Sequence, residues 1–317
     1  MTEPFRDDPS YLSELPPDLK DRRREAARRR RWRRRLVIAV VIAVAAAVIA
    51  IAAASLFKGS SDSGPATGSS TPPPASAAAP GTPAASAASK AGWAAHPGPV
   101  PILEYHAIQP PVPGAAYPQL FVPQADFQRQ MQWLKDNGYE AVTLDQVEAA
   151  WFRNGELPPK PVVVSFDDGY RSQYVAAFPE MQRLGWRGVL NLVARGSDLS
   201  DADARKMVDA GWELASHTIT HADLTTLDSA GLEREVTGSR RILRRRFGGS
   251  VDNFCYPAGR YDATVIAAVR RAGYVGAQSE VPGLASSSNP YVLARLEIQL
   301  SDGVSGMVGK LRDASAG

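Results

Sequence analysis

The sequence predicts a mainly parallel α/β domain, and two observations lead to that class. Short valine-rich apolar runs alternate along the chain with segments whose apolar residues recur at helical spacing. One apolar run, residues 162–166, is followed at once by Asp167, Asp168 and Gly169. A run of this kind is typical of a strand covered on both faces, and active sites of parallel α/β folds collect at the carboxyl ends of such strands.

The other elements follow in order from the same two patterns. Residues 100–106 predict a first strand and residues 127–138 an amphipathic helix that ends at Asn137-Gly138. Further strands are predicted at residues 139–144, 188–193, 212–215, 253–256 and 291–300. Further helices are predicted at residues 173–184, 201–210, 229–247 and 263–272. About seven strands therefore alternate with helices, in a globular domain expected to span residues 96–317.

Two neighbouring aspartates repel each other unless a cation lies beside them, which makes histidines the next residues of interest. Among four histidines, His217 and His221 share the segment Ser-His-Thr-Ile-Thr-His and would lie on one face of a helical turn. Two imidazoles and one carboxylate, with positions left open, form a catalytic metal site. Each motif alone is usually a turn or a solvated helix face, but both follow strand-like runs, and this combination favours a metal site.

These residues resemble a known family. Ser-Phe-Asp-Asp-Gly followed by Ser-His-Thr-x-x-His is similar to the first two motifs of the polysaccharide deacetylases, the NodB homology domain of carbohydrate esterase family 4. The resemblance, over roughly residues 98–300, implies a distorted (β/α)7-type barrel. It also implies Asp167 as general base and Asp168, His217 and His221 as ligands of a divalent metal, Zn²⁺ first, with Co²⁺ or Ni²⁺ as alternatives.

His106 lies at the end of the first predicted strand, and on its own such a histidine is more often structural. The family usually carries its general acid in a late Leu-x-His motif, but no histidine follows His221. In relatives that resemble poly-N-acetylglucosamine deacetylases, the motif order is rotated and a Tyr-His near the domain start provides the acid. Tyr105-His106 matches that pattern, so the resemblance implies His106 as general acid.

Residues 253–259, Asn-Phe-Cys-Tyr-Pro-Ala-Gly, stand where the family has its third motif, Arg-x-Pro-Tyr-Gly. They match the rotated subgroup's Phe-x-Tyr-Pro-x-Gly instead. The resemblance therefore implies an oxyanion and substrate pocket at Tyr256, Pro257 and Ala258, where a backbone N–H near Ala258 can still act as a donor.

Cys255 occupies the place of the motif's arginine, which in the family orients the catalytic aspartate. Arg260 and Arg295 are both candidates for that role, and the sequence does not choose between them. As the only cysteine, Cys255 excludes an internal disulfide and is expected to be a small buried residue. The five arginines between residues 240 and 246 form a basic stripe, either a solvated face or a contact for an anionic polymer or lipid headgroups.

The N-terminal region differs from the rest in composition. Residues 1–35 hold 12 basic and 7 acidic residues, a net charge of +5 in a chain of net +3, so the remainder carries −2 and no nucleic-acid partner is expected. Residues 36–57 form 22 uncharged residues, long enough to cross a bilayer core of ~30 Å. The preceding arginines predict a cytoplasmic N-terminal tail, a signal-anchor helix in the cell membrane and an extracellular catalytic domain.

Two alternatives remain open in this region. Residues 52–55, Ala-Ala-Ala-Ser, resemble a signal peptidase site, so the apolar segment could instead be a cleaved signal peptide. Residues 58–95 consist mostly of Ala, Ser, Pro and Gly and predict a disordered linker. That linker is either a tether that gives an enzyme reach or a plain spacer.

The predicted function is metal-dependent removal of N-acetyl groups from an extracellular or cell-wall N-acetylglucosamine polysaccharide, with release of acetate. An O-acetyl polysaccharide esterase would use the same residues. A non-haem Fe(II) oxygenase also uses two histidines and a carboxylate, but it would not need Asp167 beside the ligand Asp168. The missing arginine motivates a tethered carbohydrate-binding pseudoenzyme. The expected partners are the polysaccharide and the lipid bilayer at residues 36–57, and no protein partner is predicted.

Overall fold

The computed structural model describes residues 92–316, all within one compact unit, Pro83–Gly317. The predicted tail (1–35), membrane span (36–57) and linker up to residue 91 lie outside the described residues. Within residues 92–316, no helix has the length and apolar character needed to cross a membrane. Ala94 forms an antiparallel bridge with Leu157, so the folded domain begins slightly before the predicted residue 96.

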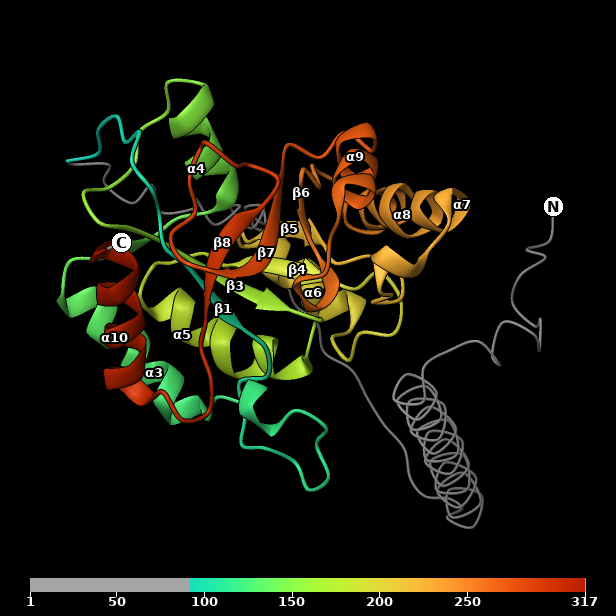
Figure 1. Ribbon diagram of the computed structural model, residues 1–317. Coiled ribbons are helices and arrows are strands. Elements are labelled where there is room, and N and C mark those ends of the chain that lie inside the picture. Colours follow the sequence, from blue (N-terminus) through green and yellow to red (C-terminus); the bar gives the residue numbers. More distant parts are fainter. Residues whose placement is uncertain (1–91, 317) are drawn as a thin grey trace, which may run out of the picture. The chain divides into compact units, whose positions relative to one another are not determined.

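In the described part of the chain, seven strands close into a parallel barrel (Figure 1). These strands are β1 (Ile102–Tyr105), β3 (Pro161–Asp167), β4 (Val189–Leu192), β5 (Glu213–Ser216), β6 (Asn253–Cys255), β7 (Gly276–Pro282) and β8 (Leu293–Glu297). The ring closes because β1 pairs in parallel with both β3 and β8. A further strand, β2 (Glu140–Ala141), pairs only with the first two residues of β3. The predicted barrel is therefore confirmed.

Helices cover the outside of the barrel. They are α3 (Gln124–Asp136), α4 (Leu144–Phe152), α5 (Phe178–Arg183), α6 (Asp201–Asp209), α7 (Ser229–Leu232), α8 (Gly238–Phe247), α9 (Ala263–Arg271) and α10 (Gly303–Ala316). Figure 1 shows α3, α5 and α10 together on one side and α7, α8 and α9 on another. Side-chain caps fix several helix starts: Thr143 and Gln146 form a capping box at α4, and Ser200 and Asp262 cap α6 and α9.

The outer and inner faces of the barrel strands belong to two different apolar clusters. Outward-facing residues of the strands, such as Leu103, Val164 and Phe166, pack with the helices in the larger cluster. Because side chains alternate along a strand, the residues between them face the barrel interior. Ile102, Val163, Val189, Ala215 and Leu293 form its lower, apolar layer. Two residues further along their strands, the interior becomes polar, and these polar side chains are fully buried.

Several of the predicted elements need correction, and three elements were not predicted. The strand expected at residues 139–144 is only Glu140–Ala141, because Thr143 already caps α4. Strand β7 was not predicted, since Gly276, Gln278 and Ser279 interrupt any apolar run. Helices α4 and α10 were also not predicted. The single helix expected at residues 229–247 consists of α7, the π-helical segment Glu233–Thr237 and α8.

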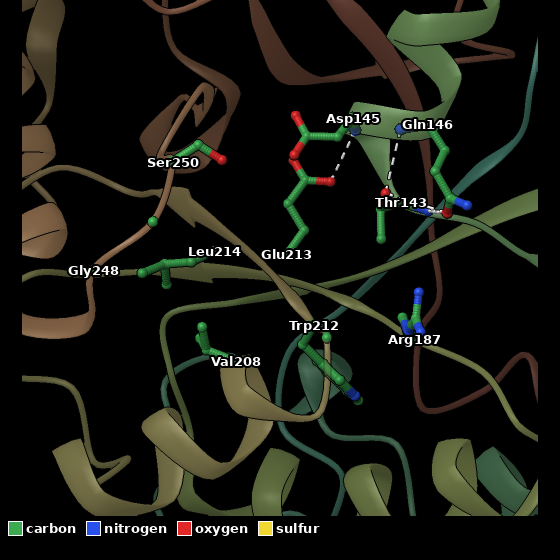
Figure 2. Close-up of a pocket in the computed structure, with 12 residues that line it drawn as sticks. Thr143, Asp145, Gln146, Arg187, Val208, Trp212, Glu213, Leu214, Gly248 and Ser250 are labelled. Carbon is green, nitrogen blue, oxygen red and sulfur yellow. Dashed lines mark hydrogen bonds between the residues drawn. The ribbon is translucent and has the colours of Figure 1, made fainter. Parts of the chain in front are cut away.

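A pocket at the amino ends of the strands contains a second group of carboxyl side chains. Figure 2 shows this pocket, of about 320 Å³, with Asp145 and Glu213 pointing toward one another. Glu213 opens β5 and accepts a hydrogen bond from the Asp145 backbone N–H at 3.0 Å. Because His217 follows the other end of β5, this pocket and the predicted catalytic residues lie at opposite ends of the barrel.

Glu148 lies beside this pocket and is only 1% exposed. Burial raises its pKa to about 8, Asp145 adds to the effect, and the contact with Asn253 offsets only part of it. The unfolded chain loses the Glu148 proton near pH 4.5, whereas the folded protein keeps it to about pH 8. Stability from this group is therefore fully present below pH 4.5 and is lost as the pH rises toward 8.

Glu148→Gln is expected to raise the thermal unfolding midpoint at pH 8 by about 5 °C, which corresponds to about 1–3 kcal/mol. At pH 4 the substitution should change the midpoint by less than about 1 °C, because the native carboxyl is then also neutral. Calorimetry at both pH values measures this difference. The exposed Glu156→Gln is the matched control and should have no effect at either pH. Equal shifts of Glu148→Gln at both pH values would contradict a titration effect.

Candidate active site

The five residues predicted to carry the chemistry meet at the carboxyl ends of the barrel strands. Asp167 ends β3 and is 1% exposed. Its Oδ1 accepts hydrogen bonds from Arg295 Nη1 at 2.9 Å and Asn191 Nδ2 at 2.7 Å. Its Oδ2 receives only the weak donor Cys255 Sγ, at 3.5 Å. Oδ2 is therefore the oxygen left to accept a proton from a reacting group.

Asp167 is held in its ionised form. Burial raises the pKa of this carboxyl, but the Arg295 guanidinium, followed by His217 and His106, outweighs burial and brings the pKa below its usual range. An ionised carboxylate at the end of a buried strand can act as a general base.

Asp168, His217 and His221 form a group suited to a metal ion. Asp168 Oδ1 lies 3.7 Å from His217 Nε2 and 3.4 Å from His221 Nε2, and all three ligand atoms lie within 4.8 Å of one another. His217 Nδ1 donates to the Cys255 carbonyl at 2.9 Å, which leaves the Nε2 lone pair facing Asp168. Two imidazole nitrogens and a carboxylate oxygen suit Zn²⁺ and similar divalent ions.

The protonation states of these ligands also fit a metal ion. Burial, together with the neighbouring His221, lowers the pKa of His217 to about 4, so its imidazole is neutral. Burial raises the pKa of Asp168, but His221, His106 and His217 more than compensate and bring it below the usual range. A metal binds neutral imidazole and ionised carboxylate, so His217 and Asp168 are in forms that can coordinate.

Backbone strain, not a helical turn, brings the two histidines together. Residues 217–221 are not helical, and Thr218 and His221 have φ angles of 64° and 61°. The helical turn considered for this segment is not formed, but the two rings do meet, with centroids 4.8 Å apart. Asp168 is also left-handed, with φ of 73°. Such conformations are unfavourable for residues other than glycine and cluster at functional sites, where the surroundings enforce them.

His106 lies beside the base, directly after β1, the strand next to β3. Glu104, His106 and Asp167 each offer a ligand-type atom within 4.8 Å of the others, and His106 Nε2 lies 3.8 Å from Glu104 Oε1. Burial lowers the pKa of His106, but the charges of Asp167 and Glu104 raise it by more than burial lowers it. The net pKa therefore lies above the ordinary value. A raised pKa beside a reaction centre suits a histidine to act as a general acid.

The structure distinguishes between the two arginines that the sequence left open. Arg260 is paired at the surface with Asp223, at 2.6 Å. Arg295, on β8, is 2% exposed; it bonds Asp167 Oδ1 and the Ser279 carbonyl, and its Nη2 lies 3.2 Å from Glu104 Oε1. Arg295 thus holds the base where the family's motif-three arginine is replaced by Cys255.

Arg295→Met is expected to lower kcat by about 10²-fold, because Asp167 loses a charged hydrogen-bond donor that orients it. The KM should change by less than about threefold, since Arg295 is buried under the site. Steady-state acetate release measures both constants. Arg260→Met is the matched control and should leave kcat within about twofold, as its ion pair is exposed. Equal losses in the two variants would contradict the assignment.

The three residues of the predicted oxyanion pocket directly follow β6. Tyr256 is fully buried and its hydroxyl donates to the Tyr291 carbonyl at 3.0 Å, so this side chain supports the fold. Pro257 is buried, whereas Ala258 is exposed and left-handed, with φ of 49°. The backbone at Ala258 is thus the part of the motif that faces outward after β6.

Several buried polar residues around the base were not predicted. For those that lie on strands, the only sequence signal is a polar residue two positions from an apolar inward-facing one. They are Glu104 on β1, Asn191 on β4, Gln278 on β7 and Gln173 at the start of the π-helical segment Gln173–Ala177. Gln173 Nε2 donates to the backbone carbonyls of His106 and Asp167, at 3.0 and 2.6 Å. It therefore fixes the carboxyl ends of β1 and β3 relative to each other.

Comparison with known proteins supports this architecture. The family model for polysaccharide deacetylase matches residues 154–277. YxkH of Bacillus subtilis (strain 168), assigned to the polysaccharide deacetylases, is 29% identical over 215 residues, which are 66% of this chain and 74% of YxkH. The poly-beta-1,6-N-acetyl-D-glucosamine N-deacetylase of Escherichia coli (strain K12) is 42% identical over 85 residues, 27% of this chain but only 12% of that protein.

Solved structures share the fold. The Streptococcus pyogenes deacetylase PplD, in complex with acetate, has a TM-score of 0.63 and 25% identity, and the match covers 68% of this chain and 99% of PplD. BC0361, a polysaccharide deacetylase from Bacillus cereus, has a TM-score of 0.60 and 28% identity, with 68% and 69% covered. With sequence motifs, barrel and relatives in agreement, we identify the chain as a member of the polysaccharide deacetylase family, a group of deacetylating hydrolases.

Proposed function

We propose that the protein is a metal-dependent N-deacetylase of a polysaccharide that contains N-acetylglucosamine. One observation carries this proposal: Asp167, His106 and the three converging ligand atoms of Asp168, His217 and His221 lie together at one end of the barrel. The substrate class is supported by the names of relatives, since the E. coli and Staphylococcus aureus (strain N315) proteins are poly-beta-1,6-N-acetyl-D-glucosamine N-deacetylases.

Each residue has a defined task in the proposed reaction. A divalent ion held by Asp168, His217 and His221 would supply Lewis-acid polarisation of the acetamide carbonyl and lower the pKa of a water molecule. Asp167 Oδ2 takes a proton from the water that attacks the carbonyl carbon. In the proposed reaction, a backbone N–H near Ala258 donates to the developing oxyanion.

The second half of the reaction needs a proton donor. The amine is a poor leaving group unless it is protonated as the carbon–nitrogen bond breaks, and His106 provides that proton. The proton that Asp167 accepted and the one that His106 donated then exchange with solvent, which restores both residues. The products are acetate and a polymer unit with a free amino group.

Acetate release by the full-length protein in detergent tests this function. Poly-N-acetylglucosamine, peptidoglycan and an O-acetylated xylan are each incubated with the protein, and acetate is quantified. Release from an N-acetylated polymer is the expected result. Release from the O-acetylated polymer alone would replace the proposal with an esterase, and release from none of them would support a carbohydrate-binding protein.

We also propose that the enzyme acts outside the cell, anchored through residues 36–57. The uncharged length of that segment and the arginines before it support this topology. Protease added to intact cells should then remove the catalytic domain, and fractionation should recover the undigested chain with the membrane. A soluble protein that begins near Ser55 would show a cleaved signal peptide instead.

A further inference from the structure

The barrel interior contains a pair of buried amides that the proposed reaction does not use directly. Asn191 on β4 and Gln278 on β7 are both fully buried. Gln278 Nε2 donates to Asn191 Oδ1 at 2.6 Å, and Asn191 Nδ2 lies 3.3 Å from Gln278 Oε1. The two side chains thus meet across the barrel, amide to amide. Buried amides are costly unless their polar atoms are satisfied, so such a pair calls for a reason.

Asn191, one member of this amide pair, contacts the proposed catalytic base Asp167. Asn191 Nδ2 donates to Asp167 Oδ1 at 2.7 Å, a shorter contact than the 2.9 Å bond from Arg295. Neighbouring backbone registers support the contact, because Asp167 pairs with Asn191 between β3 and β4. With two donors on Oδ1, the carboxylate plane is fixed from two directions.

The contact with Gln278 and the contact with Asp167 favour the same orientation of the Asn191 amide. An asparagine can present either its NH₂ group or its carbonyl oxygen at nearly the same place. Because Gln278 Nε2 donates to Asn191 Oδ1, that oxygen is held toward Gln278 and the NH₂ group is left for Asp167. The opposite orientation would place a carbonyl oxygen against a carboxylate oxygen, which is repulsive.

We propose that Asn191 and Gln278 are positioning residues that act in series, Gln278 through Asn191, to hold Asp167 with Oδ1 bound and Oδ2 free for the proton transfer. The inference deepens the proposed deacetylase function and rests on it. Arg295 supplies charge and one donor to Asp167 Oδ1, and Asn191 supplies the second donor, so that together they fix the rotation of the carboxylate. A small rotation of the carboxylate would move Oδ2 away from the attacking water, and proton transfer is sensitive to such misplacement.

A double-mutant cycle on kcat tests this arrangement. Asn191→Leu is expected to lower kcat by about 10- to 100-fold, and Gln278→Leu somewhat less. The double variant should be no worse than Asn191→Leu within about twofold, because Gln278 has no effect once Asn191 is absent. The KM should stay within about twofold throughout, since neither side chain is exposed to substrate. Independent, multiplying losses in kcat, or losses that appear only in KM, would overturn the proposal.

Stability and folding need a matched control. Gln130 is an equally buried glutamine, bonded to the Tyr105 hydroxyl and the Gly303 carbonyl on the outer side of β1. Gln130→Leu should lower the unfolding midpoint but leave kcat within about twofold. The double variant Asn191→Leu/Gln278→Leu removes both amides together and leaves neither unpaired, so it should fold even if a single variant does not. A kcat for Gln130→Leu as low as that of Asn191→Leu would show a general packing effect.

The assay also separates the inference from the proposed function. If the unsubstituted protein releases no acetate from any substrate, the proposed function fails. The inference is then judged by urea unfolding, in which Asn191→Leu should lower the midpoint less in an Asp167→Ala background than with Asp167 present. Equal shifts in both backgrounds would show that Asn191 does not hold Asp167.

Discussion

Removal of divalent metal should lower acetate release by about 10³-fold or more, which corresponds to ~4 kcal/mol of transition-state stabilisation. Asp168, His217 and His221 place three ligand atoms within 4.8 Å of one another. A divalent ion held there would polarise the acetamide carbonyl as a Lewis acid. Dialysis against a chelator, followed by an acetate assay and elemental analysis, measures the loss together with the metal content.

Controls connect that loss to the three ligands. Adding Zn²⁺ or Co²⁺ back should restore activity, and His217→Ala should keep the protein folded but remove both the metal and the activity. His96→Ala, at the histidine outside the site, is the matched substitution and should retain both. Full activity in a preparation shown to contain no divalent metal would contradict the metal-dependent mechanism.

His106→Ala is expected to lower kcat on N-acetylated polymer by about 10²- to 10⁴-fold, the usual contribution of a positioned proton donor. The metal content should stay unchanged, because His106 is not one of the three proposed ligands. The effect arises in the step in which the amine departs, since an unprotonated amide nitrogen leaves poorly. Steady-state kinetics with matched metal analysis of both proteins measures it.

A phenyl acetate ester with an electron-poor ring distinguishes this role from a structural one. Its phenolate leaves without protonation, so His106→Ala should recover most of the wild-type rate on that ester. His217→Ala should not recover, because activation of the carbonyl is still required. Equal losses of His106→Ala on polymer and ester would mean that His106 supports substrate binding or the fold.

The sequence was sufficient for most of the barrel because its strands are apolar runs. Residues 162–166 and 188–193 have no other plausible environment than a covered strand. Strand β7 was missed for the opposite reason. Its inward-facing residues, Gly276 and Gln278, are not apolar side chains, so the segment has no apolar run that would predict a strand. The position of β7 depends on its pairing with β6 and β8, which no local pattern encodes.

The active site was predictable where motifs are local. Asp167, Asp168, His217 and His221 lie in two short segments, so the resemblance located them together. Residues that support them come from distant strands: Arg295 is 128 positions from Asp167, and Gln278 is 87 positions from Asn191. Only closure of the barrel brings such pairs together. The sequence alone therefore could not show which of Arg260 and Arg295 contacts Asp167.

Because β1 pairs with both β3 and β8, the ring of strands has no beginning or end. A histidine carried by β1 reaches the same opening as one carried by β8, its direct neighbour. A proton donor can therefore be supplied by the first segment of the chain or by the last without a change in architecture. Only the point in the ring of strands at which the chain begins and ends differs. In a closed barrel, the order in which functional groups are translated and the order in which they surround the substrate are independent of each other.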